Sequence, residues 1–426
     1  MCASLADVRK PGTQGLIVRS TIVAAWVLSL LLPGTAFASD PGTADVSFST
    51  DGVKFIDFGG YDSAEGVFFD SGDRLTVVGS SSWEDGQANV LGRLLIDGRL
   101  DLSFGKAGRK TFDLPANMFP AWEWQAADDG ALIALGRLGQ SRYYLTRFGV
   151  DGRIDRTFGR DGRITGRFGE GGEPGDMLIL PAGRIVVAGT VGRETVLVAH
   201  NADGSRDRSF GIDGEARVGG HSFNLTYDPS GRFLLAGIRG NSRFVVDAFS
   251  MRGRRDTSFG QRGRASIEIT HDEEALRSPL VGVAPDGSIF LVSDLREGLS
   301  SMDIVVAKLA ADGTPEPNFG GARGWRRYDV GYFDVRTAVT VLPDGNVIVA
   351  GFILQDLFGH DHSEALLLGL RPDGNMWRAF GDEGVIRTDF GLERHVQARN
   401  VLLNDGRLVV VGNAKSSFFV ARFLLD

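Results

Sequence analysis

The sequence predicts an all-β protein: a seven-bladed β-propeller made of four-stranded antiparallel blades. A Phe-Gly motif recurs along the chain at spacings of 49 to 61 residues, and glycine-bounded runs of β-branched and aromatic residues lie between its copies. No stretch shows the period of an amphipathic helix. A repeat of about 55 residues has room for four short strands with their turns.

Composition limits the classes that need to be considered. Glycine contributes 59 of 426 residues, about twice its average share, but proline is scarce and no three-residue period exists, which excludes collagen and proline-rich disorder. A hydrophobic fraction of 42% can form a large core. The net charge of -8 argues against a nucleic-acid-binding surface, so we expect no nucleic acid partner.

The first 38 residues have the pattern of a secretory signal peptide. Basic residues precede an uncharged apolar run of 11 residues at 22–32, and Ala36-Phe37-Ala38 is a small-x-small cleavage pattern. The run is shorter than the roughly 20 residues that span a bilayer. We therefore predict cleavage after Ala38, a periplasmic or secreted location, no membrane span after cleavage, and one propeller domain over 39–426. The only cysteine, Cys2, lies in the leader, so the mature chain has no disulfide.

Most copies of the motif join an aspartate, a hydroxyl residue, Phe-Gly and a further glycine. The Phe-Gly pairs are Phe104-Gly105, Phe158-Gly159, Phe210-Gly211, Phe259-Gly260, Phe319-Gly320 and Phe380-Gly381, and a shorter copy occupies 45–48. We expect the phenylalanines to fill the space between blades. The aspartates could be calcium ligands, but an Asp two residues before Ser or Thr is typical of a turn that hydrogen-bonds its own backbone. Arginines near the motif should pair with these aspartates across blade seams, with anion binding as the alternative.

The sixth repeat shows how four strands fit into one period. Strands are predicted at 335–342, 346–352, 365–370 and 385–390, the first two joined at Asp344-Gly345. A turn of this kind recurs in all seven copies, and Asp-Gly between apolar runs predicts a type I′ hairpin with positive φ at both central residues.

The two ends of the chain complement each other. The chain ends on a third strand at 418–426, and it begins with an orphan motif at 45–48 and an orphan fourth strand at 53–58. We therefore expect the N-terminal strand to complete the last blade as its outer edge and so to close the ring.

The repeats resemble the delta-60 repeat of bacterial secreted β-propellers. The resemblance covers residues 45–426, with departures at Pro315-Glu316-Pro317-Asn318 and Met376-Trp377-Arg378-Ala379. It implies a propeller, but no common reaction, cofactor or catalytic residue.

Candidate functional residues lie in the loops that differ between repeats, because a rigid scaffold usually binds through its variable loops. Aromatic residues there are candidate anchors for a ligand, and histidines are the other candidates. The binding candidates are Tyr61, Trp83, Trp122, Tyr332, Phe358, His360, His362 and His395, with Phe119 and Phe333 as further exposed-looking aromatics.

Two functions follow from this pattern. The first is an exported, non-enzymatic, monomeric propeller that binds a protein or glycan on its variable-loop face. The alternative is a hydrolase or lyase acting on an extracellular polymer or ester, with Asp272, Glu273 and His395 near the channel mouth. Serine-hydrolase, zinc-protease and phosphate-loop motifs are absent from the sequence. His360-Asp361-His362 is more typical of a solvated loop than of a metal site. We therefore predict no catalytic residue, no metal and no cofactor.

Overall fold

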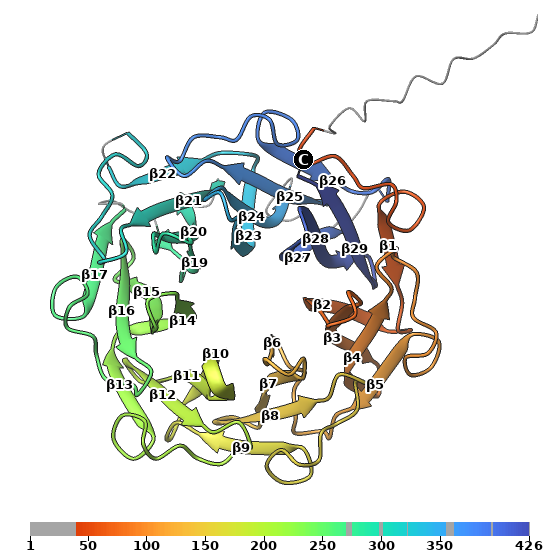
Figure 1. Cartoon of the computed structure of the whole chain (residues 1–426), viewed down its shortest axis with the longest axis horizontal. Coiled ribbons are helices and arrows are strands. Elements are labelled where there is room, and N and C mark those ends of the chain that lie inside the picture. The colour runs from red at the N-terminus through yellow and green to blue at the C-terminus, as the bar shows by residue number, and fades with distance from the viewer. Residues whose placement is uncertain are drawn as a thin grey trace, which may run out of the picture. The chain divides into compact units, whose positions relative to one another are not determined.

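The computed structural model describes residues 40–425, apart from 270–274, 298–300, 322, 355–361 and 393–394. In this part of the chain, antiparallel sheets stand around a ring, each with its first strand nearest the centre (Figure 1). The one helix described is the 3-10 turn η1 (Pro181–Gly183), and no helix there is long and apolar enough to cross a membrane. The all-β prediction is confirmed, whereas the predicted leader lies outside the described residues.

Five of the sheets have four strands. Repeat 1 holds β2 (Tyr61–Phe69), β3 (Leu75–Trp83), β4 (Gly86–Leu94) and β5 (Arg109–Asp113), and repeat 2 holds β6 (Glu123–Ala126), β7 (Leu132–Leu138), β8 (Arg142–Phe148) and β9 (Arg163–Arg167). Repeat 3 holds β10 (Glu173–Ile179), β11 (Ile185–Val191), β12 (Glu194–His200) and β13 (Glu215–Gly219), and repeat 4 holds β14 (His221–Asp228), β15 (Arg232–Arg239), β16 (Arg243–Ser250) and β17 (Arg264–Glu268). Repeat 7 holds β27 (Val396–Asn404), β28 (Arg407–Ala414) and β29 (Ser417–Leu424) with β1 (Val53–Ile56).

The other two repeats share one sheet of nine strands. Repeat 5 contributes β18 (Ala275–Leu276), β19 (Leu280–Val283), β20 (Ile289–Glu297), β21 (Ser301–Leu309) and β22 (Trp325–Tyr328), and repeat 6 contributes β23 (Phe333–Val341), β24 (Val347–Leu354), β25 (Ser363–Leu370) and β26 (Val385–Thr388). A single parallel pair, Met302 with Phe333, joins β21 to β23. The prediction of seven separate four-stranded blades is therefore wrong: the structure has five, because this pair merges two repeats into one sheet.

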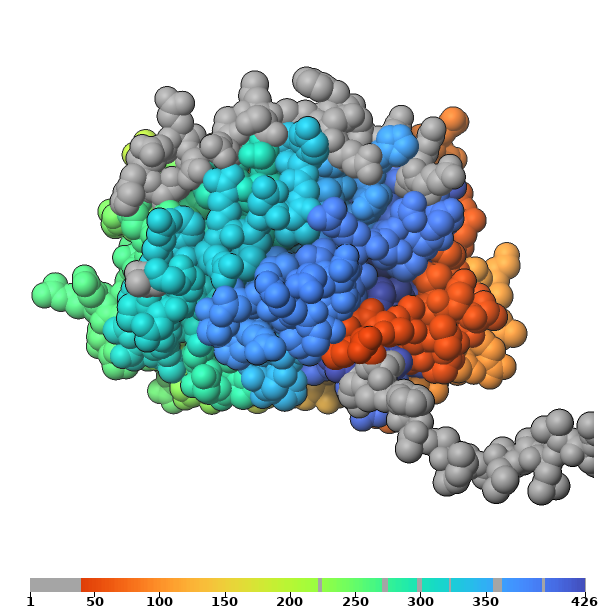
Figure 2. Space-filling view, turned by 90° about the horizontal axis from the view of Figure 1, so that it is seen from above, coloured from red at the N-terminus to blue at the C-terminus, as the bar shows by residue number. Residues whose placement is uncertain are grey.

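The first strand closes the ring, as predicted. Strand β1 pairs antiparallel with β29, with Val53 opposite Ala421 and Ile56 opposite Phe418. Figure 2 shows the red N-terminal segment packed against the blue C-terminal repeats. The last sheet therefore contains both ends of the described chain.

The turns between first and second strands differ partly from the prediction. Both central residues have positive φ at Asp405-Gly406 and at Ala182-Gly183, as a type I′ turn requires. At Asp286-Gly287 only the glycine does, and the Asp286 carboxylate accepts a hydrogen bond from the backbone N–H of Ser288 at 2.8 Å. This local bond stabilises negative φ at the aspartate and leaves the left-handed position to glycine.

Each phenylalanine of the motif packs where two repeats meet. The described core forms seven buried apolar clusters, and each contains one motif phenylalanine together with residues of two consecutive repeats. Phe104, for example, lies with Leu91 of repeat 1 and with Leu132 and Phe148 of repeat 2. Burying one such ring contributes about 1.5–3 kcal/mol of hydrophobic stabilisation. The predicted role of these phenylalanines is confirmed.

The motif aspartates anchor a hydrogen-bonded clamp across five seams. Asp101 Oδ1 accepts bonds from the backbone N–H and hydroxyl of Ser103, and Asp101 Oδ2 accepts one from Arg93 Nε at 2.9 Å. Arg93 also donates to the carbonyl of Val150 in repeat 2. The five sets of aspartate, arginine and carbonyl are Asp101, Arg93, Val150; Asp155, Arg147, Ala202; Asp207, Arg184, Met251; Asp256, Arg232, Ala311; and Asp45, Arg422, Ile96.

The prediction that the ion pairs of arginine and aspartate cross the blade seams is mostly wrong. Within the five sets, four ion pairs lie inside one repeat, and only Asp45 with Arg422 joins opposite ends of the chain. The bond that crosses each seam is the one from arginine to a carbonyl. The turn-stabilising interpretation of the aspartates is supported, since Oδ1 of each accepts hydrogen bonds from the backbone N–H and the hydroxyl of the Ser or Thr two residues later.

The innermost strands are tied by a second set of bonds. In five seams a side-chain oxygen of one repeat accepts a hydrogen bond from a backbone N–H next to or in the inner strand that follows. The pairs of acceptor and donor are Asn413 with Ala64, Asn89 with Ala121, Gln125 with Ile179, Asp176 with Leu225, and Asp294 with Arg336. Each bond gives a partner to a backbone N–H group that the hydrogen bonds between strands leave unpaired.

Glycines near the ends of the second strands are required by close packing. A Cβ atom at Gly351 would lie 2.0 Å from the carbonyl oxygen of Val335, and the inner strand bulges at this position, between Arg336 and Ala338. Gly351→Ala should therefore lower the free energy of unfolding by about 2–3 kcal/mol. Chemical denaturation measures this loss. Gly86→Ala is the control, because a Cβ atom there meets nothing within 4 Å, and a loss equal to that of Gly351→Ala would contradict the steric explanation.

Candidate functional site

Two tyrosines are the most accessible of the predicted anchors. Tyr61 is 81% exposed at the start of β2, and Tyr332 is 68% exposed immediately before β23. Both strands are the first strands of their repeats, so the two side chains lie at the same end of the ring. The connections between second and third strands also lie at this end, which we call the loop face.

The two tryptophans instead contribute to the scaffold. Trp83 donates a hydrogen bond from Nε1 to the carbonyl of Gly59, and Trp122 donates one to the carbonyl of Gly175 in repeat 3. Both rings are half-buried and pack against apolar clusters. The polar and apolar parts of both indoles therefore have partners within the protein, and their role as ligand anchors stays a prediction.

Two further aromatics near the loop face differ in exposure. Phe333 is 4% exposed, so its prediction as an exposed-looking aromatic is wrong, because it pairs with Leu354 and Met302 at the sheet junction. Phe119 is 40% exposed, and the guanidinium of Arg137 lies 4.4 Å from its ring centroid. A ring held in this way offers a flat apolar surface.

The predicted histidines are only partly described. His362 is exposed just before β25, whereas Phe358 and His360 lie outside the described residues. His395 is half-buried before β27, has φ of 51°, and its carbonyl accepts a hydrogen bond from Lys415 N–H at 3.0 Å. Asp272 and Glu273 also lie outside the described residues, so the predicted acidic site at the channel mouth stays a prediction.

A groove on the loop face could hold a polar ligand. Its volume is about 650 Å³, and the loop between β7 and β8 and the segment after β9 form most of it. Asn117, Gln140, Arg142, Arg167 and Glu170 contribute polar side chains. Ligand pockets have volumes of about 300–1,000 Å³, so this groove is large enough for a small ligand or part of a polymer.

Three carboxylates on neighbouring inner strands were missed by sequence reasoning. They are Glu65 on β2, Glu123 on β6 and Asp176 on β10 (Figure 1 shows these strands side by side). Burial raises the pKa of Glu65 to about 7, against the opposing effects of Arg399 and the Ser63 hydroxyl. Burial and the nearby carboxylates of Asp176 and Glu65 raise the pKa of Glu123 well above its usual value.

The third carboxylate has a structural role as well. Asp176 accepts backbone hydrogen bonds from Met177 and from Leu225 of the next repeat, and burial raises its pKa. A repeat-by-repeat alignment of the inner strands could have placed these acids in neighbouring strands. It could not have shown their raised pKa, which depends on burial around the ring.

Three other carboxylates could hold a cation. Asp303, Asp329 and Asp334 each offer one oxygen, and these oxygens lie within 4.8 Å of one another. Within the described residues, no other three or more His, Cys, Asp or Glu side chains bring their ligand atoms this close together. None of the three was among the candidate residues predicted from the sequence.

A groove beside β5 is lined by basic residues and is relevant to the predicted alternative that the arginines near the motif bind anions. It measures about 530 Å³ and is lined by Lys106, Arg109, Lys110, Arg153 and Arg156. Lys110 Nζ donates a hydrogen bond to the Asp151 carbonyl at 2.6 Å, and burial lowers the pKa of Lys110. Lys110 therefore helps to join repeat 1 to repeat 2. Anion binding in this groove stays a prediction.

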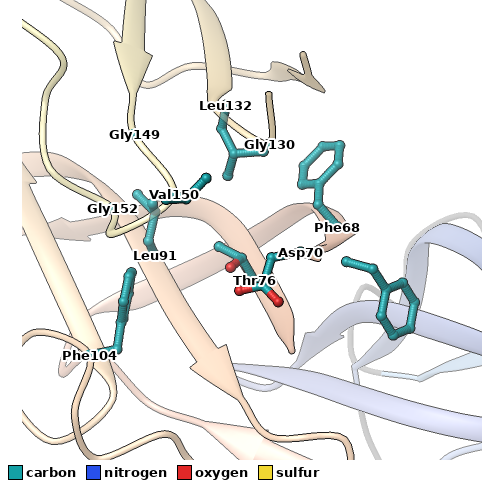
Figure 3. Close-up of a pocket in the computed structure, with 11 residues that line it drawn as sticks. Phe68, Asp70, Thr76, Leu91, Phe104, Gly130, Leu132, Gly149, Val150 and Gly152 are labelled. Atoms are coloured by element: carbon teal, nitrogen blue, oxygen red, sulfur yellow. The ribbon is translucent and has the colours of Figure 1, made fainter. Parts of the chain in front are cut away.

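A small cavity between repeats 1 and 2 is part of the core. Figure 3 shows Phe68, Leu91, Phe104 and Leu132, which come from both repeats and line it. Its volume is about 10 Å³. A water molecule needs at least about 10–15 Å³, so the cavity is too small for an organic ligand.

The fold defines the class: this is a β-propeller of four-stranded antiparallel blades. No protein-family model matches the chain, and no curated protein matches it.

Several solved structures show a distant likeness. A protein from Lactobacillus plantarum is 11% identical, with 76% of this chain and 88% of that chain covered and a TM-score of 0.49. BamB from Moraxella catarrhalis is 12% identical, with 85% of each chain covered and a TM-score of 0.40. The Penicillium chrysogenum α-L-arabinanase is 14% identical, with 71% and 92% covered and a TM-score of 0.39. At these scores none of them supports a functional argument.

Proposed function

We propose that this protein is an exported, non-enzymatic propeller of the delta-60 type that binds a protein or polysaccharide ligand on its loop face. The observation that carries the proposal is the exposure of Tyr61 and Tyr332 at the same end of the ring. Large aromatic side chains are costly to leave in water, and they are favoured where a ligand covers them. The polar groove of about 650 Å³ belongs to the same face.

The scaffold beneath this face is a closed ring in which hydrogen bonds join neighbouring repeats. Export rests on the leader pattern in residues 1–38, and the delta-60 assignment rests on the repeated motif. We infer that the nine-stranded sheet is two fused units, so that the ring consists of seven, because repeats 5 and 6 each keep their own motif phenylalanine and apolar cluster. A scaffold of this kind holds variable loops in fixed positions.

Affinity capture from envelope extract and culture medium, followed by mass spectrometry, would identify the ligand. The double variant Tyr61→Ala and Tyr332→Ala should then bind that ligand at least about tenfold more weakly, a loss of about 1.4 kcal/mol. Leu102→Ala is the control, because Leu102 is 73% exposed in a motif turn at the other end of the ring. Unchanged binding by the double variant, measured by calorimetry, would reject the loop face as the binding surface.

A second candidate is a hydrolase or lyase that acts on an extracellular polymer or ester. The specific observation in its favour is the acid group on β2, β6 and β10, since a carboxyl with a pKa of about 7 can exchange a proton near neutral pH. Turnover of a polysaccharide or ester by the wild type, abolished in Glu65→Gln, would support this function over the first. A panel of such substrates without turnover would count against it.

A further inference from the structure

The junction between repeats 5 and 6 brings two buried aspartates together. Strands β21 and β23 meet at the parallel pair of Met302 with Phe333, and the next residue of each strand is Asp303 and Asp334. These side chains are 2% and 0% exposed. Asp329, which follows β22 and is exposed, supplies the third carboxylate of the group. The pair that fuses the two repeats therefore also assembles the acidic cluster.

In repeat 1, the aspartate at the position of Asp334 has a hydrogen-bond donor for each of its carboxylate oxygens. Asp62 occupies the place of Asp334, and in both cases the backbone N–H four residues earlier donates to Oδ2, from Phe58 at 2.8 Å and from Val330 at 2.7 Å. The other oxygen of Asp62 accepts a bond of 2.5 Å from the hydroxyl of Ser81, which lies opposite it on β3.

Repeat 6 lacks this hydroxyl donor. The residue opposite Asp334 is Ile353, which has no polar group, and Asp334 Oδ1 is buried without a hydrogen-bond partner. An unpaired buried carboxylate oxygen is costly, so a positive partner at this position would be strongly favoured.

The charge of the cluster matches a divalent cation. Three carboxylates carry three negative charges, and Arg327 pairs with Asp303 and offsets one of them. Oxygen-only ligands favour Ca²⁺ or Mg²⁺. Oxygens on opposite sides of Ca²⁺ lie about 4.6–5.2 Å apart, compared with about 4.0–4.2 Å around Mg²⁺. The three carboxylate oxygens, which lie within 4.8 Å of one another, are therefore close enough together to share one Ca²⁺.

We propose that Asp303, Asp329 and Asp334 form a calcium site between repeats 5 and 6. The ion would give Asp334 Oδ1 its missing partner and would link β21, the end of β22 and the start of β23. Residues 329–334 include Tyr332, whose carbonyl accepts a hydrogen bond from Met302 N–H at 3.3 Å. Calcium would thus fix one part of the loop face, although the site does not depend on what that face binds.

Isothermal titration of the chelator-treated protein with CaCl₂ tests the proposal directly. We expect one Ca²⁺ per chain, with a Kd of about 10⁻³ M or tighter, as in other extracellular sites. Mg²⁺ should bind at least about tenfold more weakly, because its coordination shell is smaller. No heat of binding at millimolar CaCl₂, or equal affinity for the two ions, would overturn the assignment.

Two variants locate the site. Asp329→Asn should weaken Ca²⁺ binding by at least about tenfold, and because Asp329 is exposed this change leaves the core intact. Asp113→Asn is the matched control, because Asp113 is exposed and is the last residue of β5, the fourth strand of repeat 1, at the position that corresponds to Asp329. If Asp113→Asn weakens binding as much as Asp329→Asn, or if Asp329→Asn has no effect, the site is not at this junction.

Discussion

Arg422→Ala should lower the free energy of unfolding by about 3 kcal/mol, the largest single-residue effect that we expect. Arg422 is 6% exposed and donates hydrogen bonds to Asp45, to Ser47 and to the Ile96 carbonyl. Its guanidinium also lies 4.8 Å from the centroid of the Phe48 ring. Removing it leaves the buried Asp45 with the more distant Arg407 as its cationic partner, beside the hydrogen bonds from Ser47, and breaking a buried ion pair typically costs about 3–5 kcal/mol.

Urea denaturation of both proteins measures this difference. Arg99→Ala is the control, since Arg99 and Asp97 form an ion pair whose side chains are 76% and 41% exposed, and such pairs contribute at most about 1 kcal/mol. If Arg422→Ala and Arg99→Ala lose equal free energy of unfolding, the contacts of Arg422 at the ring closure stabilise the protein no more than a surface ion pair does.

Glu65→Gln should change the pH dependence of stability. The pKa of Glu65 is about 7 in the folded protein, above its ordinary value of 4.5. Between these two pH values the folded state binds more protons than the unfolded state, so the contribution of this group to stability falls as pH rises. At pH 8 the variant, which carries no charge at this position, should be more stable than the wild type by up to about 3 kcal/mol. At pH 4 the two should be equal.

The quantity to measure is the difference in unfolding free energy between variant and wild type from pH 4 to pH 8. Most other groups titrate equally in both proteins and cancel, while Glu123 shares part of the effect because it interacts with Glu65. Glu84→Gln, at an exposed carboxylate between β3 and β4, should give a flat difference. A flat difference for Glu65→Gln as well would mean that Glu65 is solvated and ionised normally.

Much of the fold could be predicted because its signals are local and repeated. The strands expected at 346–352 and 365–370 match β24 and β25 closely, and the orphan strand at 53–58 contains β1. The fusion of repeats 5 and 6 could not be predicted in this way. It depends on one pair, Met302 with Phe333, whose formation is decided by the spacing between two sheets and not by the pattern of either strand.

The candidate site was less predictable, because exposure and pKa depend on the whole ring. Tyr61 begins β2 and Trp83 ends β3 at the same end of one sheet, but the indole of Trp83 reaches the Gly59 carbonyl whereas Tyr61 stays in solvent. Nor could sequence spacing reveal that Asp334 lacks the hydroxyl donor that Asp62 has. That difference arises from the residue opposite it on the next strand, Ile353 instead of Ser81.

The pairing of β1 with β29 has a consequence for the order of folding. Val53 meets Ala421, a partner near the far end of the chain, so this contact has the greatest loop-closure cost of any strand pair in the ring. During synthesis β1 has no partner until β29 has been made. The last sheet is therefore completed late, and until β1 pairs with β29 the outer edge of β29 remains open to other chains.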